Sequence, residues 1–150
     1  MLLFELHMTY DEIMPIAIQA RRDFDNKSVD VQYLKSLVEK HLPYIAENYK
    51  DGLTQWIEQS VANFPIDCCE IGAAVLLDRV GEGEIAHGRY EREPIGPHNI
   101  RKSHTFWTQA ETPGKTALMA DITADQYGGP PIFVGSLKRP WTLPDWTKIT

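Results

Sequence analysis

Two adjacent cysteines, a histidine and an aspartate are the residues of this chain whose types and order could do covalent chemistry. Cys68 and Cys69 stand at the start of an apolar run, residues 71–77, that is typical of a buried helix. The unpaired N–H groups and the dipole at a helix N-terminus stabilise an anion, so a thiol there is favoured as a thiolate nucleophile. His104 and Asp121 follow as a candidate base and a candidate orienting carboxylate.

The strand pattern around the histidine and the aspartate sets a geometric condition. His104 and Asp121 lie in two predicted strands, and Thr112-Pro113-Gly114 predicts a hairpin between them. Side chains alternate along a strand, so the two residues share a face if they pair directly or lie two positions apart on the diagonal. A register shifted by one residue would put them on opposite faces. In the favourable registers the carboxylate holds the imidazole tautomer and leaves the other ring nitrogen for the thiol.

The elements that must position these residues form a helical half and a strand half. Thr9 and Glu12 form a capping box at the start of the first helix, and the turn 81–83 ends the last one. Apolar positions at helical spacing predict helices over residues 9–24, 31–42, 44–62 with a break at 51–52, and 69–79. Strands are predicted at residues 85–91, 104–109, 117–123 and 131–134.

Helices followed by antiparallel strands predict the α+β class, with N-terminal helices packed on a C-terminal antiparallel sheet of about four strands. We expect a single domain over residues 1–150, in which 1–62 form the helical part and 63–150 the core that carries the site. The tail that contains Pro140, Trp141, Pro144 and Trp146 is expected to be irregular and to cover the core.

Charge and cysteine usage exclude several classes of function. A net charge of −6 and a pI near 5.3 argue against nucleic acid or an anionic membrane as the partner. Neighbouring cysteines cannot form an unstrained bridge, which favours a reducing compartment. The N-terminus has no basic leader, so we expect a cytoplasmic protein, or one exported without a leader. The basic pairs are expected to be solvated; they are Arg21-Arg22, Arg101-Lys102 and Lys138-Arg139.

Zinc and other cofactors are not expected. The candidate ligands are Cys68, Cys69, His87, His98 and His104. They form no C-x-x-C or H-x-x-x-H element, and vicinal cysteines do not both reach one tetrahedral ion comfortably, so the sequence predicts no metal site.

Three blocks of the chain resemble small bacterial and phage proteins of the papain-like superfamily, in particular its transglutaminase-like members. The resemblance covers about residues 60–136. The blocks are Phe64-Pro65 with Cys69 and Leu76-Leu77, His104 with Trp107, and Asp121-Ile122-Thr123-Ala124-Asp125-Gln126-Tyr127.

The resemblance implies a papain-like core and a role for each matching residue. Cys69 would be the nucleophile, His104 the general base and Asp121 its orienting partner. The family has a side-chain amide six residues before the cysteine in its oxyanion hole, which implies Asn63 together with the backbone N–H of Cys69. Trp107 and Gln126 would contribute to substrate binding.

Two departures from the family pattern bear on activity. Glu70 follows the cysteine where glycine is common, and a carboxylate turned toward the sulfur would oppose a thiolate. The histidine block has one extra residue before Trp107, which moves that ring to the other strand face unless the strand bulges.

The sequence therefore predicts a cysteine-dependent hydrolase or acyl-transferase acting on an amide through a Cys-His-Asp triad. A glutamine side chain, a peptide bond or a cell-wall amide would each fit, so the partner is a protein or peptide substrate. One alternative is an inactive papain-like interaction module, an adaptor or immunity-type protein, whose acidic surface suits a basic partner. Another is a redox-sensing pair at Cys68 and Cys69. Nothing in the pattern selects an oligomeric state.

Overall fold

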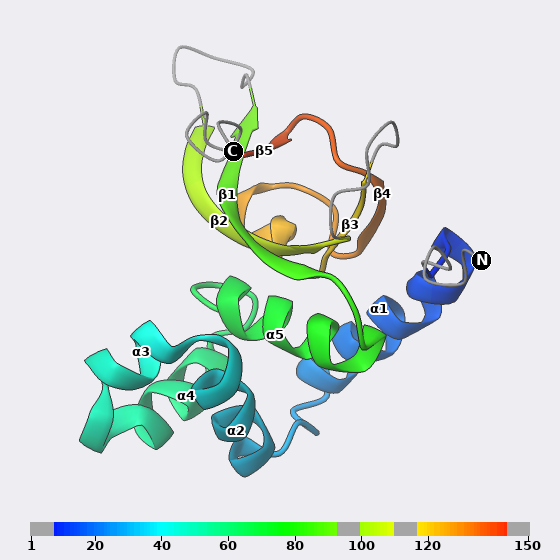
Figure 1. The fold of residues 1–150 in the computed structure, drawn as a ribbon. Coiled ribbons are helices and arrows are strands. Elements are labelled where there is room, and N and C mark those ends of the chain that lie inside the picture. The colour runs from blue at the N-terminus through cyan, green and yellow to red at the C-terminus, as the bar shows by residue number, and fades with distance from the viewer. Residues whose placement is uncertain (1–7, 93–99, 110–116, 144–150) are drawn as a thin grey trace, which may run out of the picture.

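The computed structural model describes residues 8–92, 100–109 and 117–143, which form a helical half followed by an antiparallel sheet. This order confirms the predicted α+β class. In Figure 1 the sheet curls at the top of the molecule, and helix α5 lies between the sheet and the helices α2, α3 and α4. None of the helices in the described part of the chain has the length and hydropathy needed to cross a bilayer.

The helices begin and end close to their predicted caps. The Glu12 side chain accepts a hydrogen bond from the backbone N–H of Thr9 at 2.9 Å, which forms the capping box. Gly81 ends the last helix at φ 83°, a left-handed conformation that favours glycine. The helices are α1 (Tyr10–Asp25), α2 (Val31–His41), α3 (Pro43–Asn48), the short 3-10 helix η2 (Lys50–Gly52), α4 (Leu53–Ala62) and α5 (Cys69–Val80).

The sheet contains five strands in the order β4-β3-β2-β1-β5, rather than the predicted four or so. The strand missed from the sequence is β5, which pairs Trp141 with Tyr90 in the segment expected to be irregular. Two residues are too few for an alternating pattern. The strands are β1 (Glu84–Arg92), β2 (Ile100–Thr108), β3 (Leu118–Asp121), β4 (Phe133–Ser136) and β5 (Trp141–Thr142). The predicted turn at residues 112–114 lies outside the described residues.

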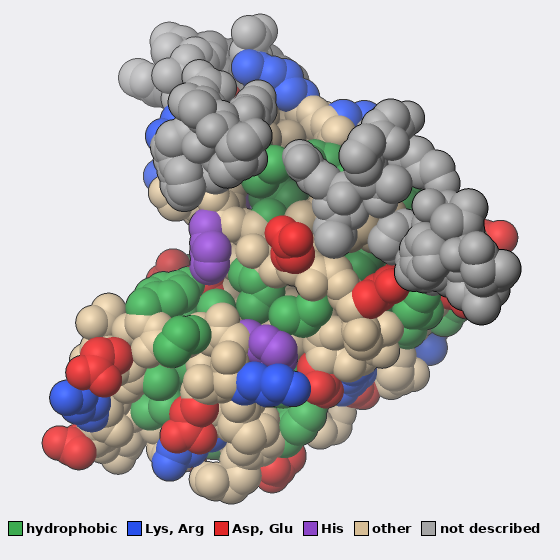
Figure 2. All heavy atoms as spheres, viewed as in Figure 1, with side chains coloured by type: hydrophobic (Ala, Val, Ile, Leu, Met, Phe, Trp, Pro, Cys, Tyr) green, Lys and Arg blue, Asp and Glu red, His purple; other side chains and the backbone are tan. Residues whose placement is uncertain are grey.

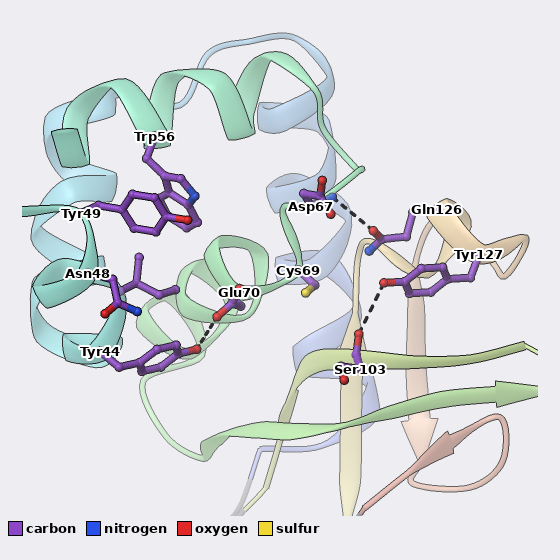
Figure 3. Close-up of a pocket in the computed structure, with 11 residues that line it drawn as sticks. Tyr44, Asn48, Tyr49, Trp56, Asp67, Cys69, Glu70, Ser103, Gln126 and Tyr127 are labelled. Atoms are coloured by element: carbon purple, nitrogen blue, oxygen red, sulfur yellow. Dashed lines mark hydrogen bonds between the residues drawn. The ribbon is translucent and has the colours of Figure 1, made fainter.

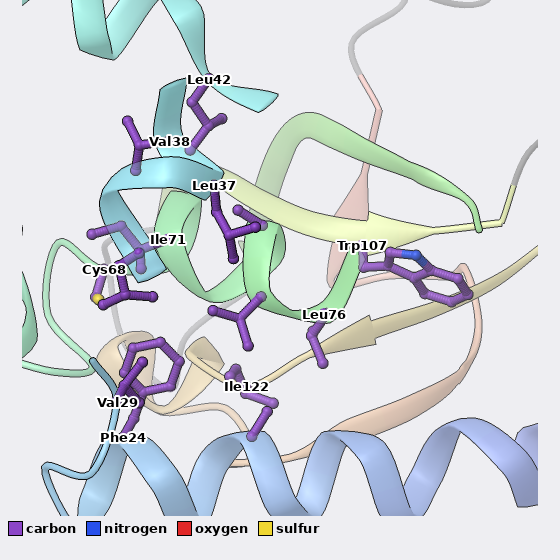
Figure 4. Close-up of a cluster of buried hydrophobic side chains, with 14 of the residues drawn as sticks. Phe24, Val29, Leu37, Val38, Leu42, Cys68, Ile71, Leu76, Trp107 and Ile122 are labelled. Atoms are coloured by element: carbon purple, nitrogen blue, oxygen red, sulfur yellow. The ribbon is translucent and has the colours of Figure 1, made fainter. Parts of the chain in front are cut away.

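Both faces of the sheet are buried. Trp107 and Ala120 face the helices and join the larger core, part of which is drawn in Figure 4. Phe106 and Met119, their neighbours along the strands, belong to a second cluster on the other face, together with Trp141. Because adjacent strand residues face opposite ways, β2 supplies both cores at once.

Arg21 joins α1 to the segment that follows β3. Its guanidinium donates to both carboxylate oxygens of Asp125 and to the carbonyl of Ile122, each at 2.8 Å. The Arg21 side chain is only 12% exposed, so the expectation that it would be solvated was wrong, while Arg22 is exposed. The spacing of two arginines in an amphipathic helix does not tell which of them faces a distant acid.

We predict that Arg21→Lys lowers the free energy of unfolding by about 1–3 kcal/mol, because lysine cannot form the two-pronged contact with Asp125. The matched variant Arg22→Lys is expected to stay within about 0.5 kcal/mol of the wild type. Urea unfolding followed by circular dichroism measures both. Equal effects of the two substitutions would contradict the role given to Arg21.

Candidate active site

The two cysteines have opposite environments although they are neighbours. Cys69 is the first residue of α5, is partly exposed and lines a pocket. Cys68 is 1% exposed within the larger core. Burial, with the nearby charge of Cys69 as a smaller cause, raises the pKa of the Cys68 thiol to about 12. Cys69 is therefore the thiol that a substrate can reach, and Cys68 packs as a small hydrophobic side chain.

The histidine lies in the sheet with one ring nitrogen on the aspartate. His104 is 2% exposed, and its Nε2 lies 2.6 Å from Oδ2 of Asp121. Strands β2 and β3 pair Trp107 with Ala120 and Thr108 with Met119, a register that places His104 and Asp121 diagonally on one face. This is one of the two registers that the sequence required.

The carboxylate of Asp121 is 2% exposed and accepts four hydrogen bonds. Oδ2 accepts from His104 and, at 2.7 Å, from the indole N–H of Trp141. Oδ1 accepts from the backbone N–H of Thr123 at 2.9 Å and from its hydroxyl at 3.1 Å. These bonds satisfy both oxygens of the buried carboxylate, and the contact with Nε2 holds the imidazole in one orientation.

The other side of the imidazole faces the thiol. Nδ1 of His104 is buried without a fully formed hydrogen bond, and the Cys69 side chain interacts with the ring. Burial by itself lowers the pKa of His104, but the hydrogen bonds to Asp121 and Cys69 and the charges of both residues raise it to about 9. With this pKa the ring is a cation at neutral pH.

A pocket of about 480 Å³ opens at the sulfur. Figure 3 shows Cys69 between side chains from the helices α3 and α4 and those from the 3-10 helix η3 (Ala124–Tyr127). Figure 2 shows the surface hollowed between the helical half and the sheet half. The lining residues are Tyr44, Ile45, Asn48, Tyr49, Trp56, Asp67, Cys69, Glu70, Ser103, Gln126 and Tyr127.

Gln126 lines this pocket and has a side-chain amide with only one of its two ends bonded. Its Oε1 accepts a hydrogen bond from the backbone N–H of Asp67 at 3.2 Å, while its Nε2 is buried and has no partner. In Figure 3 that nitrogen lies on the side of Cys69. A buried donor without an acceptor costs free energy unless a ligand supplies one, so this nitrogen is suited to a substrate oxygen.

Two residues implied by the resemblance do not line the pocket. Asn63 caps the end of α4 and is exposed. Trp107 is fully buried in the larger core and donates its indole N–H to the carbonyl of Glu82 at 2.8 Å. β1 and β2 pair without a bulge from Glu84–Thr108 to Arg92–Ile100, so the extra residue in the histidine block puts Trp107 on the face opposite His104.

Glu70 is turned away from the sulfur. Its carboxylate accepts a hydrogen bond from the hydroxyl of Tyr44, and in Figure 3 this pair lies on the far side of the pocket from Gln126. On the near side, the ring of Tyr127 packs edge-on against His104, with centroids 5.3 Å apart. Burial, followed by the charges of Cys69, Asp67 and Asp121, raises the pKa of Tyr127 to about 12.

Sequence reasoning missed two contributors to the site. Trp141 was expected in a covering segment, yet its indole N–H binds Asp121. Tyr44 comes from a helix outside the region of resemblance and engages Glu70. No local pattern indicates either contact. Among the residues that the structure describes, no group of three or more His, Cys, Asp or Glu side chains is placed to hold a metal ion.

Comparisons of this chain with protein-family models, with curated proteins and with solved structures find no match.

We predict that His104 titrates with a pKa of about 9 in the wild type. Asp121→Asn removes one of the two negative charges beside the ring and should lower that pKa toward the ordinary value of about 6.5. A two-dimensional ¹H–¹⁵N NMR titration, with His104→Gln to assign the signal, measures both. A wild-type ring that titrates near its ordinary value would contradict this electrostatic account.

The raised pKa of His104 also predicts how the free energy of unfolding changes with pH. A histidine pKa that is raised on folding contributes stability that is fully present below about pH 6.5 and is lost as the pH rises through about 9. At 1.36 kcal/mol per pKa unit, the loss is on the order of 3 kcal/mol. Urea unfolding at pH 6 and at pH 9.5 measures it, and a smaller loss is expected for Asp121→Asn.

Proposed function

We propose that this protein is a cysteine-dependent hydrolase or acyl-transferase that acts on an amide through Cys69, His104 and Asp121. One observation carries the proposal: a buried imidazole stands between an accessible thiol at a helix N-terminus and a carboxylate with four hydrogen bonds. This arrangement of nucleophile, base and orienting group is the one that covalent acyl transfer needs. We also infer a papain-like core, in which the helix that carries the cysteine packs on the strands that carry the other two residues.

In the proposed reaction, the Cys69 thiolate attacks the carbonyl carbon of the amide and forms a tetrahedral oxyanion. Protonated His104 donates its Nδ1 proton to the leaving nitrogen, the C–N bond breaks, and an amine or ammonia departs. A thioester on Cys69 remains. Water or a second amine, deprotonated by His104, then attacks the thioester and releases the product with the thiolate restored.

Two donors suit the oxyanion. The first N–H groups of a helix have no partner within the helix, which leaves the Cys69 N–H available beside its own sulfur. The unpartnered Nε2 of Gln126 supplies a side-chain donor on the same side. Gln126 thus takes the role that the sequence assigned to Asn63.

The substrate carbonyl can belong to a glutamine side chain, a peptide bond or a cell-wall amide. Water as the second nucleophile makes the reaction a hydrolysis or deamidation, and an amine makes it an acyl transfer. The pocket lies in the hollow between the helical half and the sheet half, where both resolving nucleophiles have access.

The alternative of an inactive interaction module depends on Glu70 as a mark of decay. The hydrogen bond from Tyr44 holds that carboxylate on the far side of the pocket, which weakens the reason for this alternative. The redox alternative is weakened by the burial of Cys68 in the core, where neither an oxidant nor a reductant reaches its sulfur.

We predict that iodoacetamide at pH 7 alkylates Cys69 at least about tenfold faster than it alkylates glutathione, because protonated His104 stabilises the thiolate. Mass spectrometry of the intact protein measures the rate. Cys69→Ala should abolish the fast phase and the release of ammonia or amine from any amide that is turned over. The adjacent variant Cys68→Ala should retain both.

If iodoacetamide alkylates Cys69 no faster than it alkylates glutathione, the proposed enzymatic function is wrong. If, in addition, a captured partner binds the wild type and Cys69→Ala with equal affinity, the interaction module is favoured instead.

We predict that Gln126→Glu lowers kcat by about 10²–10³, because the substitution keeps the shape and the acceptor for Asp67 but removes the donor to the oxyanion. The matched variant Asn63→Asp, which alters the exposed residue at the family position, should change kcat less than about twofold. Steady-state rates on one amide substrate measure both. A larger loss in Asn63→Asp than in Gln126→Glu would assign the oxyanion donor to Asn63.

A further inference from the structure

We propose that the pocket beside Cys69 selects amides whose neighbouring residue carries a cationic side chain, as lysine and arginine do. The inference rests on the proposed function of Cys69 and specifies its substrate class. Three properties of the residues that line the pocket support it: their negative charge, their aromatic rings, and the positions of the carboxylates and rings relative to the Cys69 sulfur.

The charge of the wall is negative. Asp67 and Glu70 flank Cys69 along the chain, and both line the pocket. No lysine or arginine is among the described residues that line it. The imidazole of His104 is buried, and its Nε2 is paired with Asp121. A cleft that is lined by one sign of charge concentrates ligands of the other sign, and the net charge of −6 acts in the same direction.

The aromatic surface lies at the helical end of the pocket. The rings of Tyr49 and Trp56 are stacked, with centroids 5.2 Å apart and planes inclined by 24°. Tyr44 and Tyr49 are each 44% exposed. Large aromatic side chains with accessible faces next to carboxylates attract ammonium and guanidinium groups through the ring quadrupole.

The groups follow one another in a useful order. In Figure 3, Gln126 and the Cys69 sulfur lie at one end of the pocket, Glu70 comes next, and Tyr44, Tyr49 and Trp56 lie at the other end. An amide held at the sulfur therefore directs a long side chain past Glu70 toward the two stacked rings. The volume of about 480 Å³ lies within the range of small-molecule sites, about 300–1,000 Å³.

Tyr44 keeps Glu70 in the position that a cation needs. Burial, followed by the hydrogen bond to Glu70, raises the pKa of the Tyr44 hydroxyl, so it remains a neutral donor to this carboxylate. The carboxylate then offers its remaining acceptor sites to the pocket.

The charge preference can be measured on the thiol alone, without a substrate. Cys69 is modified with two methanethiosulfonate reagents, one that transfers a trimethylammonium-ethyl group and one that transfers a sulfonate-ethyl group. We expect the cationic reagent to react at least about tenfold faster than the anionic one in the wild type. Glu70→Gln should reduce this ratio about three- to tenfold, and Asp67→Asn should reduce it as well. Asparagine tolerates the left-handed backbone of residue 67, at φ 56°.

The matched control is Glu58→Gln, which makes the same change of net charge at an exposed residue outside the pocket. It should leave the ratio unchanged. Because His104 is common to all four proteins, its charge cancels in the comparison. A wild-type ratio of one or less, or a ratio that falls equally in Glu58→Gln and Glu70→Gln, would overturn the cation preference.

A second measurement compares an arginine with its neutral isostere. We expect arginine amide to protect Cys69 from iodoacetamide at concentrations at which citrulline amide gives at least fivefold less protection, and Glu70→Gln to remove the difference. Equal protection by the two amides overturns the proposal. The proposed function fails separately, through slow alkylation of Cys69 by the neutral reagent in the absence of any ligand.

Discussion

The rest of the site depends on the hydrogen bonds that the buried carboxylate of Asp121 accepts. An ion removed from water is costly unless each of its acceptor positions is occupied, and here four donors occupy them. These donors come from β2, from β5 and from the turn after β3. Satisfying one charge therefore draws three parts of the sheet together and orients His104 at the same time.

The short segment 121–127 connects the buried carboxylate of Asp121 with the residues that line the pocket. Asp121 holds it from the inside of the curled sheet, and Arg21 holds it from α1 through Asp125. With both ends anchored, the segment places the Gln126 amide and the Tyr127 ring beside Cys69. The segment thus combines the proposed orienting acid, the proposed oxyanion donor and a ring that packs on the imidazole, and ion contacts hold it on two sides.

At the start of α5, two adjacent cysteines have different roles: Cys68 packs in the core, and Cys69 lines the pocket. Cys68 is the N-cap and Cys69 the first residue of the helix, and one sulfur enters the core while the next faces the pocket. Cys68 closes the packing between α5 and the other helices, and Cys69 gains the helix N-terminus, the imidazole and access to solvent. The acidic residue that follows Cys69 is turned away from the sulfur, because the carboxylate of Glu70 accepts a hydrogen bond from Tyr44.

The amino-acid pattern by itself determined the local features of this protein. Helix bounds follow from caps and apolar spacing, and strand alternation was enough to state which registers would let His104 meet Asp121. Alternation also set the two possible positions of Trp107, and the unbroken β1–β2 ladder placed it on the face opposite His104. These features depend on neighbours within a few residues, which is why a linear pattern contains them.

Only the tertiary structure decided which distant segments meet. Gln126 rather than Asn63 faces the sulfur because the chain between α4 and α5 leaves Asn63 exposed while the turn after β3 folds over Cys69. The contacts of Trp141 with Asp121 and of Tyr44 with Glu70 join residues that are 20 and 26 positions apart. Such contacts form when the whole chain packs and brings a donor to a buried carboxylate or a side chain to the edge of the pocket. No repeat or spacing in the sequence indicates which residue the partner will be.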